Sequence, residues 1–143
     1  HYEGRRCNCG GIGCFEKYAS ANALIEDFNA LAPPSPCQNT KQIFERYYSG
    51  DSLAIKAVDQ YVTYLGAGLA NIINIFNPQI LIIGGGVSEA GEDFIQKVRL
   101  SAKSRTMPTS FDRVEIVKAQ LGNRAGMLGA AAFALKMCQK ARK

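Results

Sequence analysis

Three cysteines stand close together near the start of the chain, at positions 7, 9 and 14, and three glycines lie between Cys9 and Cys14. Thiolates are good zinc ligands, and glycine permits the tight turns that wrap a loop around one ion. A disulfide and idle thiols are the alternatives. A Cys-X-Cys pair would make a strained disulfide, and idle thiols would not need the glycines. The segment therefore predicts a metal site held by Cys7, Cys9 and Cys14.

A closed structural zinc site takes four protein ligands, and only three thiols are present in this segment. His1 is the single histidine and lies six residues before Cys7. It is one candidate for the fourth ligand, and an exposed, mobile terminal residue is the alternative that we favour. The other two cysteines, Cys37 and Cys138, are expected to be structural.

The composition is that of an ordinary soluble globular domain, with 143 residues, 47% hydrophobic and 20% charged. No apolar run approaches the roughly 20 residues that span a bilayer, so no membrane partner is expected. The net charge is +5, but the basic residues are scattered apart from Arg5-Arg6 and the C-terminal tail. Nucleic-acid binding is therefore not expected. Five cysteines, three of them clustered, are untypical of a secreted disulfide framework, so we expect a cytoplasmic protein.

Apolar periodicity predicts helices over most of the chain. The first runs from Gly13 to about Leu31 and ends at a cluster of prolines. A short helix is expected from about Thr40 to Tyr48. The next, capped by Asp51 or Ser52, reaches Phe76. Glycines at positions 66 and 68 inside it predict a close approach by another element or a ligand.

The pattern predicts two strands, at 79–83 and 114–119. A helix capped by Ser88 is expected at 89–105, and a helix of small residues, suited to close packing, at 125–139. The first strand is apolar on both faces, which is typical of the middle of a sheet covered on both sides. Two strands cannot supply such a sheet. We expect the missing strands from residues upstream of His1 or from another chain.

Three glycines, Gly84, Gly85 and Gly86, follow the first strand directly. Ligands of open α/β sheets gather at the carboxyl ends of strands, and a turn without side chains lets the backbone approach one. The segment matches neither the dinucleotide fingerprint nor a P-loop. On its own it fits a ligand site and an ordinary strand-to-helix turn equally well.

The segment CNCGGIGCFE, residues 7–16, resembles the signature of ROK proteins, a family of sugar kinases and related transcriptional repressors. The resemblance implies that the three cysteines, with a histidine about ten residues before the first, hold a structural zinc. That position falls before His1, so His1 is out of register. The resemblance also implies that Glu16 accepts hydrogen bonds from sugar hydroxyls. A carboxylate at a helix start is stabilised by the helix dipole.

Two further segments extend the resemblance. NPQILIIGGGVS, residues 77–88, is similar to the adenosine-contacting motif of ROK kinases and of actin/hexokinase-like ATPases. This implies that Gly84, Gly85 and Gly86 contact ATP and that Val87 packs on the base. AQLGNRAG, residues 119–126, resembles the closing segment of glucokinase-like members. Many of them carry an acidic residue where Arg124 stands.

The resemblance implies an α/β chain that is the C-terminal lobe of the actin/hexokinase-like ATPase (ribonuclease H-like) fold, helix-rich with an incomplete sheet. Residues 1–16 would form a zinc and sugar loop, and residues 17–143 the helical and nucleotide-contacting part. The catalytic base, the phosphate loops and further sugar contacts are expected upstream of His1. No catalytic residue is therefore assigned within this chain.

The implied activity of the full-length parent is ATP-dependent phosphorylation of a hexose, glucose or a close relative, at the 6-hydroxyl, with ATP, Mg²⁺ and structural zinc. We expect the 143-residue chain alone to be inactive. Association into a homo-oligomer is also expected. One alternative is the sugar-sensing domain of a ROK repressor. Another is a freestanding zinc-knuckle interaction module, which would need a self-sufficient core.

Overall fold

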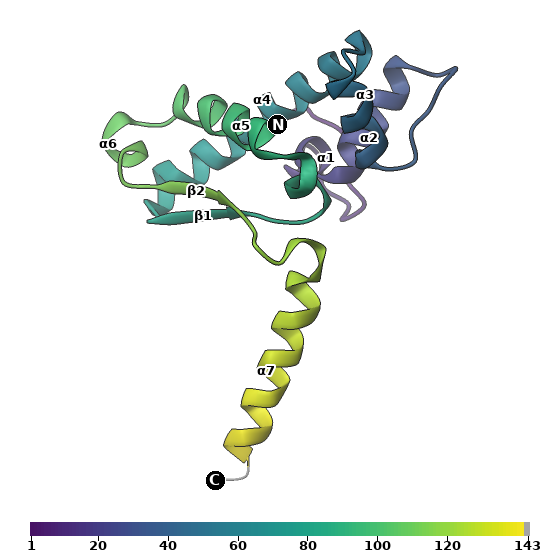
Figure 1. Ribbon diagram of the computed structural model, residues 1–143. Helices are drawn as coiled ribbons and strands as arrows, with labels where there is room; N and C mark the ends of the chain where they lie inside the picture. Colours follow the sequence, from purple (N-terminus) through teal and green to yellow (C-terminus); the bar gives the residue numbers. More distant parts are fainter. Residues whose placement is uncertain (142–143) are drawn as a thin grey trace.

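The computed structural model describes residues 1–141 (Figure 1). The elements, in chain order, are α1 (Glu16–Ala19), α2 (Ala21–Leu31), α3 (Thr40–Tyr48), α4 (Ser52–Phe76), β1 (Ile80–Ile83), η1 (Gly86–Ala90), α5 (Glu92–Lys103), α6 (Pro108–Phe111), β2 (Glu115–Lys118), η2 (Gly122–Arg124) and α7 (Ala125–Ala141). None of the helices among the described residues is both long and apolar enough to cross a bilayer.

The long helix α4 is the centre of the packed body, and α1, α2, α3 and α5 all contact it. It begins where expected, because the Asp51 carboxylate accepts the N–H groups of Leu53 and Ala54 at 2.8 and 3.3 Å. It ends at Asn77, which adopts the left-handed conformation (φ 44°). The apolar stripe of α4 faces the core, where Tyr61 stacks on Phe94 of α5.

Two glycines of α4 let other elements approach its backbone, as the sequence predicted. A Cβ added at Gly66 would lie 2.6 Å from the Cβ of Ser101, on α5. One added at Gly68 would overlap the ring of Phe15, which precedes α1. Both neighbours are protein atoms, so close packing between elements is the reason for these glycines.

The described residues form a sheet of two strands, β1 and β2, paired in parallel with Ile80 opposite Glu115. Helices cover one of its faces (Figure 1). On that face Ile83 and Ile116 are buried, whereas Ile80 and Ile82 are 49% and 63% exposed. Strand β1 has the apolar sequence of a central strand, yet one of its two faces is therefore uncovered.

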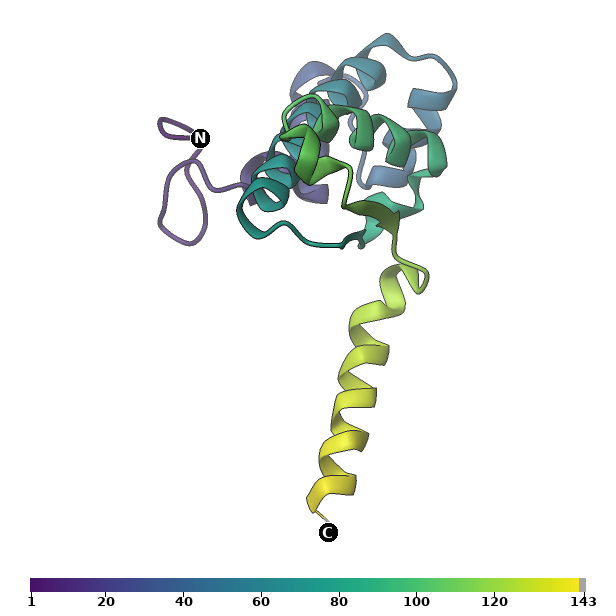
Figure 2. The ribbon, with the colours of Figure 1, turned by 90° about the vertical axis from the view of Figure 1, so that its left-hand side faces the viewer.

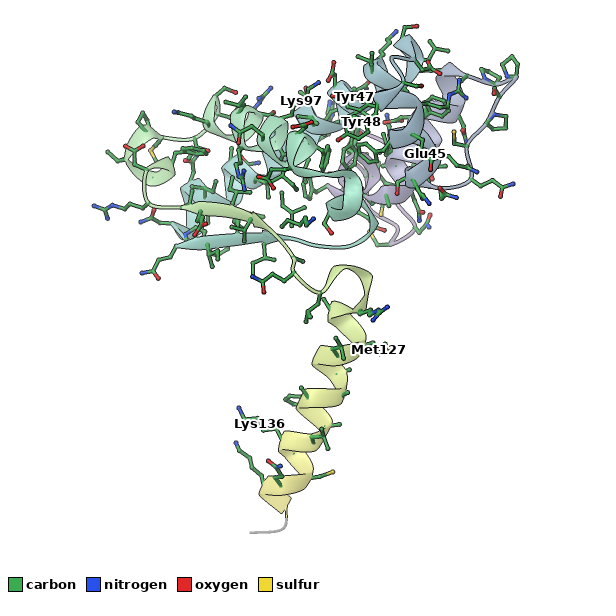
Figure 3. All side chains as sticks on the ribbon, in the orientation of Figure 1. Glu45, Tyr47, Tyr48, Lys97, Met127 and Lys136 are labelled. Atoms are coloured by element: carbon green, nitrogen blue, oxygen red, sulfur yellow. The ribbon has the colours of Figure 1, made fainter. Side chains whose placement is uncertain are left out.

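Helix α7 extends away from the packed body in both ribbon views (Figures 1 and 2). Its large apolar side chains are exposed: Met127, Leu128, Phe133, Leu135 and Met137. Figure 3 shows Met127 and Lys136 on a helix with no neighbouring element. Within residues 1–141, the predicted close packing of its small residues is not found.

Three local predictions were wrong. The first helix is interrupted at Ser20, whose backbone is extended and whose hydroxyl accepts the N–H of Ala23 at 3.1 Å. Ser88 does not cap α5. It is buried in η1 and donates its hydroxyl to the carbonyl of Gly85 at 2.7 Å, and α5 starts after Gly91. The segment between α5 and β2, for which no helix was predicted, contains α6.

Candidate functional site

Residues 4–14, called the cysteine loop below, fold back on themselves as a small hairpin. The N–H of Cys7 donates to the carbonyl of Gly11 at 2.9 Å, and the N–H of Gly10 to the carbonyl of Cys7 at 3.0 Å. Arg6 and Ile12 form an isolated antiparallel bridge. The turn therefore brings residues from both arms of the loop to the same place.

The three thiols that the sequence predicts as ligands lie together. Their Sγ atoms are all within 4.8 Å of one another, and those of Cys9 and Cys14 are 3.5 Å apart. That separation is too long for a disulfide, in which the sulfurs are about 2.05 Å apart. Zinc–thiolate bonds of about 2.3 Å in a tetrahedral site place sulfurs about 3.8 Å apart. The thiols of Cys7, Cys9 and Cys14 therefore fit such an ion with small shifts.

The loop backbone also acts on the thiols. The pKa of Cys9 is lowered, mainly by a hydrogen bond from the backbone of Gly11 and to a smaller extent by one from the Cys14 thiol. Hydrogen bonds with Cys9 and Cys7 raise the pKa of Cys14 to about 11. A Cβ at Gly11 would lie 3.3 and 3.4 Å from the sulfurs of Cys14 and Cys9. Glycine at this position leaves the N–H close to the sulfurs.

His1 is exposed, as expected, but it has definite contacts. Its amino group donates to the carbonyl of Gly13 at 2.8 Å, and its ring stacks on Tyr18 with centroids 5.6 Å apart. The group of side chains that could hold a metal comprises Cys7, Cys9 and Cys14 only, among the residues described. His1 is therefore not placed as a fourth ligand.

Glu16, the predicted sugar-binding residue, is the first residue of α1 and follows Cys14 by two positions. Its side chain is exposed. The adjacent Lys17 is directed elsewhere, since its ammonium group lies 2.9 Å from the carboxylate of Glu26 on α2. The cysteine loop thus leads directly to an accessible carboxylate that this neighbouring cation does not neutralise.

Residues 84–86, called the glycine loop below, follow the carboxyl end of β1. Gly85 has a φ of 81° and open space where a side chain would stand. A Cβ added at Gly84 would lie 3.7 Å from its nearest neighbour, an atom of Ala119. One added at Gly86 would lie 3.6 Å from an atom of Thr40. Val87 is 8% exposed and belongs to the core, so the loop backbone, not this side chain, faces the open space.

An open groove of about 660 Å³ lies beside the glycine loop. Its lining comes from α3 and from both ends of η1: Asn39, Thr40, Lys41, Phe44, Glu45, Tyr48, Gly86 and Ala90. Figure 3 labels Glu45 and Tyr48 at this side of the body. The phenol of Tyr48 donates to the carbonyl of Ala90 at 2.6 Å. No sequence pattern indicated that α3 forms this wall, because Tyr48 and Ala90 are 42 positions apart.

Several known proteins are similar to this chain. The ROK family model matches residues 1–137. A glucokinase of Thermotoga maritima is 37% identical over 91% of this chain and 45% of its own length. A xylose repressor of Bacillus spizizenii is 30% identical over 94% of this chain and 34% of its own. The chain therefore spans less than half the length of these relatives.

Solved structures of ROK proteins are also similar to this chain. A ROK family glucokinase from Streptomyces griseus, in complex with glucose and AMPPNP, superposes with a TM-score of 0.81 at 32% identity, covering 92% of this chain and 47% of that one. A ROK transcriptional regulator, a homologue of the E. coli MLC protein, gives a TM-score of 0.68 at 28% identity over 82% of this chain and 32% of its own.

The predicted fold class is confirmed: the chain is a helix-rich part of the actin/hexokinase-like ATPase fold with an incomplete sheet, and its structural relatives include ROK hexokinases. Glucokinases and repressors are both among its relatives, so the family is wider than either activity. From the match over residues 1–137 and the shared fold, the chain belongs to the ROK family.

Proposed function

We propose that this chain is the C-terminal part of an ATP-dependent hexose kinase of the glucokinase type, acting on the 6-hydroxyl of glucose or a close relative. The observation that carries the proposal is the clustering of three thiols in a loop that leads directly to the exposed carboxylate of Glu16. Similarity to glucokinases, one of them solved with glucose and AMPPNP, supports it.

In this proposal residues 1–16 are the metal and sugar loop. Cys7, Cys9 and Cys14 would hold zinc, whose contribution is structural: a bound ion fixes the conformation of the loop. Glu16 binds the sugar, because two carboxylate oxygens can accept hydrogen bonds from two neighbouring hydroxyls. Its place at the start of α1 favours the negative charge.

Residues 17–143 supply the helical body and the nucleotide contacts. Gly84, Gly85 and Gly86 present backbone to the open space at the end of β1, and the groove beside them is lined by the half-exposed ring of Tyr48. A planar base stacks well on such a ring. We propose that ATP binds here, with its Mg²⁺ held at the phosphates.

We propose that the chain alone does not transfer phosphate, and the ion pairs of three of its five aspartates support this. Asp27 pairs with Arg5 at 2.7 Å, Asp51 with Arg46 at 2.6 Å and Asp59 with Lys97 at 2.8 Å. The base that removes the proton of the sugar hydroxyl would come from the other part of the fold. That part would also cover β1 and α7, whose apolar side chains are exposed.

A sugar-sensing part of a ROK repressor is the second candidate. The similarity to xylose repressors over most of the chain favours it, since the same loop and carboxylate would serve a sensor. The open space at the glycine loop favours the kinase, because a sensor of sugar alone does not need a nucleotide site.

Calorimetric titration of the 143-residue chain with glucose and with a non-hydrolysable ATP analogue, beside a coupled kinase assay, tests the proposal. We expect binding of both ligands and no turnover. Glu16→Gln should weaken glucose binding about tenfold or more, because a charged hydrogen-bond acceptor is lost. Glu115→Gln, which removes the charge of an exposed glutamate on β2, is the control and should change nothing.

The outcomes separate the candidates. Glucose binding without nucleotide binding would favour the repressor, and turnover by this chain alone would contradict its proposed inactivity. Light scattering on the same samples tests the predicted homo-oligomer.

A further inference from the structure

A partly buried ion pair joins the cysteine loop to the helical body. The guanidinium of Arg5, just before the thiols, lies 2.7 Å from the carboxylate of Asp27 on α2, and these side chains are 34% and 18% exposed. The same Nη1 atom donates to the carbonyl of Lys17 at 3.0 Å. One side chain therefore connects the loop to α1 and to α2.

The backbone of Arg5 is held as firmly as its side chain. Its N–H donates to the phenol oxygen of Tyr18 at 2.6 Å, and its guanidinium lies 4.8 Å from the centroid of the Tyr18 ring. Tyr18 is 6% exposed and packs against Tyr64 of α4, with ring centroids 4.9 Å apart. The contact thus reaches the central helix.

Arg5 also holds the second arm of the cysteine loop. Its carbonyl accepts the N–H of Gly13 at 2.8 Å, immediately before Cys14. Cys7 follows Arg5 by two residues. Fixing Arg5 therefore fixes both arms of the hairpin, one on each side of the thiol group.

We propose that Arg5 and Asp27 form a clamp that pre-organises the three thiols for metal binding and links metal occupancy to the position of α1 and Glu16. This inference rests on the proposed metal site. A loop already held in its bound conformation loses less conformational entropy when the ion binds, so affinity rises. By linkage, the bound ion stabilises the clamped arrangement in return.

A purely structural ion pair would behave differently. Losing it would lower the stability of the chain equally with and without metal. A clamp that pre-organises the thiols must instead weaken metal binding itself, while the helical body stays folded. The chain offers a matched control, the ion pair between Lys17 and Glu26, which lies on the same two helices and does not involve the cysteine loop.

The experiment is a Co²⁺ titration of the 143-residue chain carrying Cys138→Ser, followed by Zn²⁺ competition. The thiolate-to-cobalt charge-transfer band reports binding at the loop. We expect Asp27→Asn and Arg5→Met each to weaken binding about tenfold, the lower end for groups that orient metal ligands. The loss of metal affinity in the double variant should be smaller than the product of the two single losses, because the two partners act together. Glu26→Gln should match the parent.

Arg5→Lys is included because it keeps the positive charge at this position. A lysine cannot bridge Asp27 and the Lys17 carbonyl as the planar guanidinium does, so binding should weaken here too. Far-UV circular dichroism checks that each variant is folded. If the parent shows the cobalt band, and Asp27→Asn and Arg5→Lys change its Co²⁺ affinity by no more than twofold, the clamp alone would be overturned. A parent without the band would overturn the metal site and the clamp together.

Discussion

The cysteine loop and the glycine loop both need glycine, but for opposite reasons. In the cysteine loop, a Cβ added at Gly4 would overlap the hydroxyl of Tyr18 and lie 2.8 Å from the Cα of Gly13. In the glycine loop, a Cβ at Gly84 or Gly86 would meet only ordinary contacts at 3.7 and 3.6 Å. The first glycine makes room for the protein's own packing. The others leave room that the protein does not fill.

The difference separates two kinds of requirement. Gly4 is needed so that the loop can pack against Tyr18, which makes it a residue of folding and of metal-site geometry. The glycine loop is anchored by the buried Val87, and its backbone remains accessible. Substitutions in the cysteine loop should therefore change stability and metal affinity. Substitutions at Gly84 and Gly86, which do not have the positive φ of Gly85, should change ligand affinity and little else.

The largest effect is expected from removing one thiol. Cys9→Ser should weaken metal binding at least about a hundredfold, because the hydroxyl of serine does not replace a thiolate as a zinc ligand. The measurement is the charge-transfer band of bound Co²⁺. Cys138→Ser, which changes an exposed thiol on α7, is the control and should bind as the parent does. Equal affinity in Cys9→Ser would show that the cysteine loop is not a metal loop.

The next effect tests the packing of Gly4. Gly4→Ala should lower the free energy of unfolding by about 1–3 kcal/mol, the usual cost of overpacking, because the new methyl group would overlap Tyr18. Urea denaturation monitored by circular dichroism measures it. Gly129→Ala on α7, where nothing lies within 4 Å, should be neutral or slightly stabilising, since alanine is the better helix former. A neutral Gly4→Ala would remove the contrast between the two loops.

Much of the fold could be predicted because its signals are local. The helix at Thr40–Tyr48 and the helix at Ser52–Phe76 have the predicted bounds. Asp51 caps the second of them with its own side chain, and Asn77-Pro78 follows it. The three thiols could be grouped as well, since they lie within eight residues that include three glycines and can form one turn. In each case the deciding contacts lie within a few residues.

The features that could not be predicted have two causes, a contact between distant residues and local hydrogen bonds of serine hydroxyls. The ion pair of Arg5 with Asp27 spans 22 positions, and no spacing rule points to it. Ser88 had the pattern of a helix cap, yet its hydroxyl donates back to Gly85 within the buried turn η1. Ser20 interrupts a helical pattern that continues through it. At Ser20 and Ser88, a hydrogen bond of the hydroxyl to a backbone group three residues away competed with the helical pattern.

The smallest effect is expected in the glycine loop. Gly86→Ala should change the free energy of unfolding by no more than about 0.5 kcal/mol, because the methyl group would meet only the hydroxyl of Thr40 at ordinary distance. It should weaken binding of a fluorescent ATP analogue about fivefold, because the methyl group would narrow the groove. Gly126→Ala, at an open position on α7, is the control. Unchanged nucleotide affinity would mean that the three glycines form only a strand-to-helix turn, and a large loss of stability would mean that they, like Gly4, serve the protein's own packing.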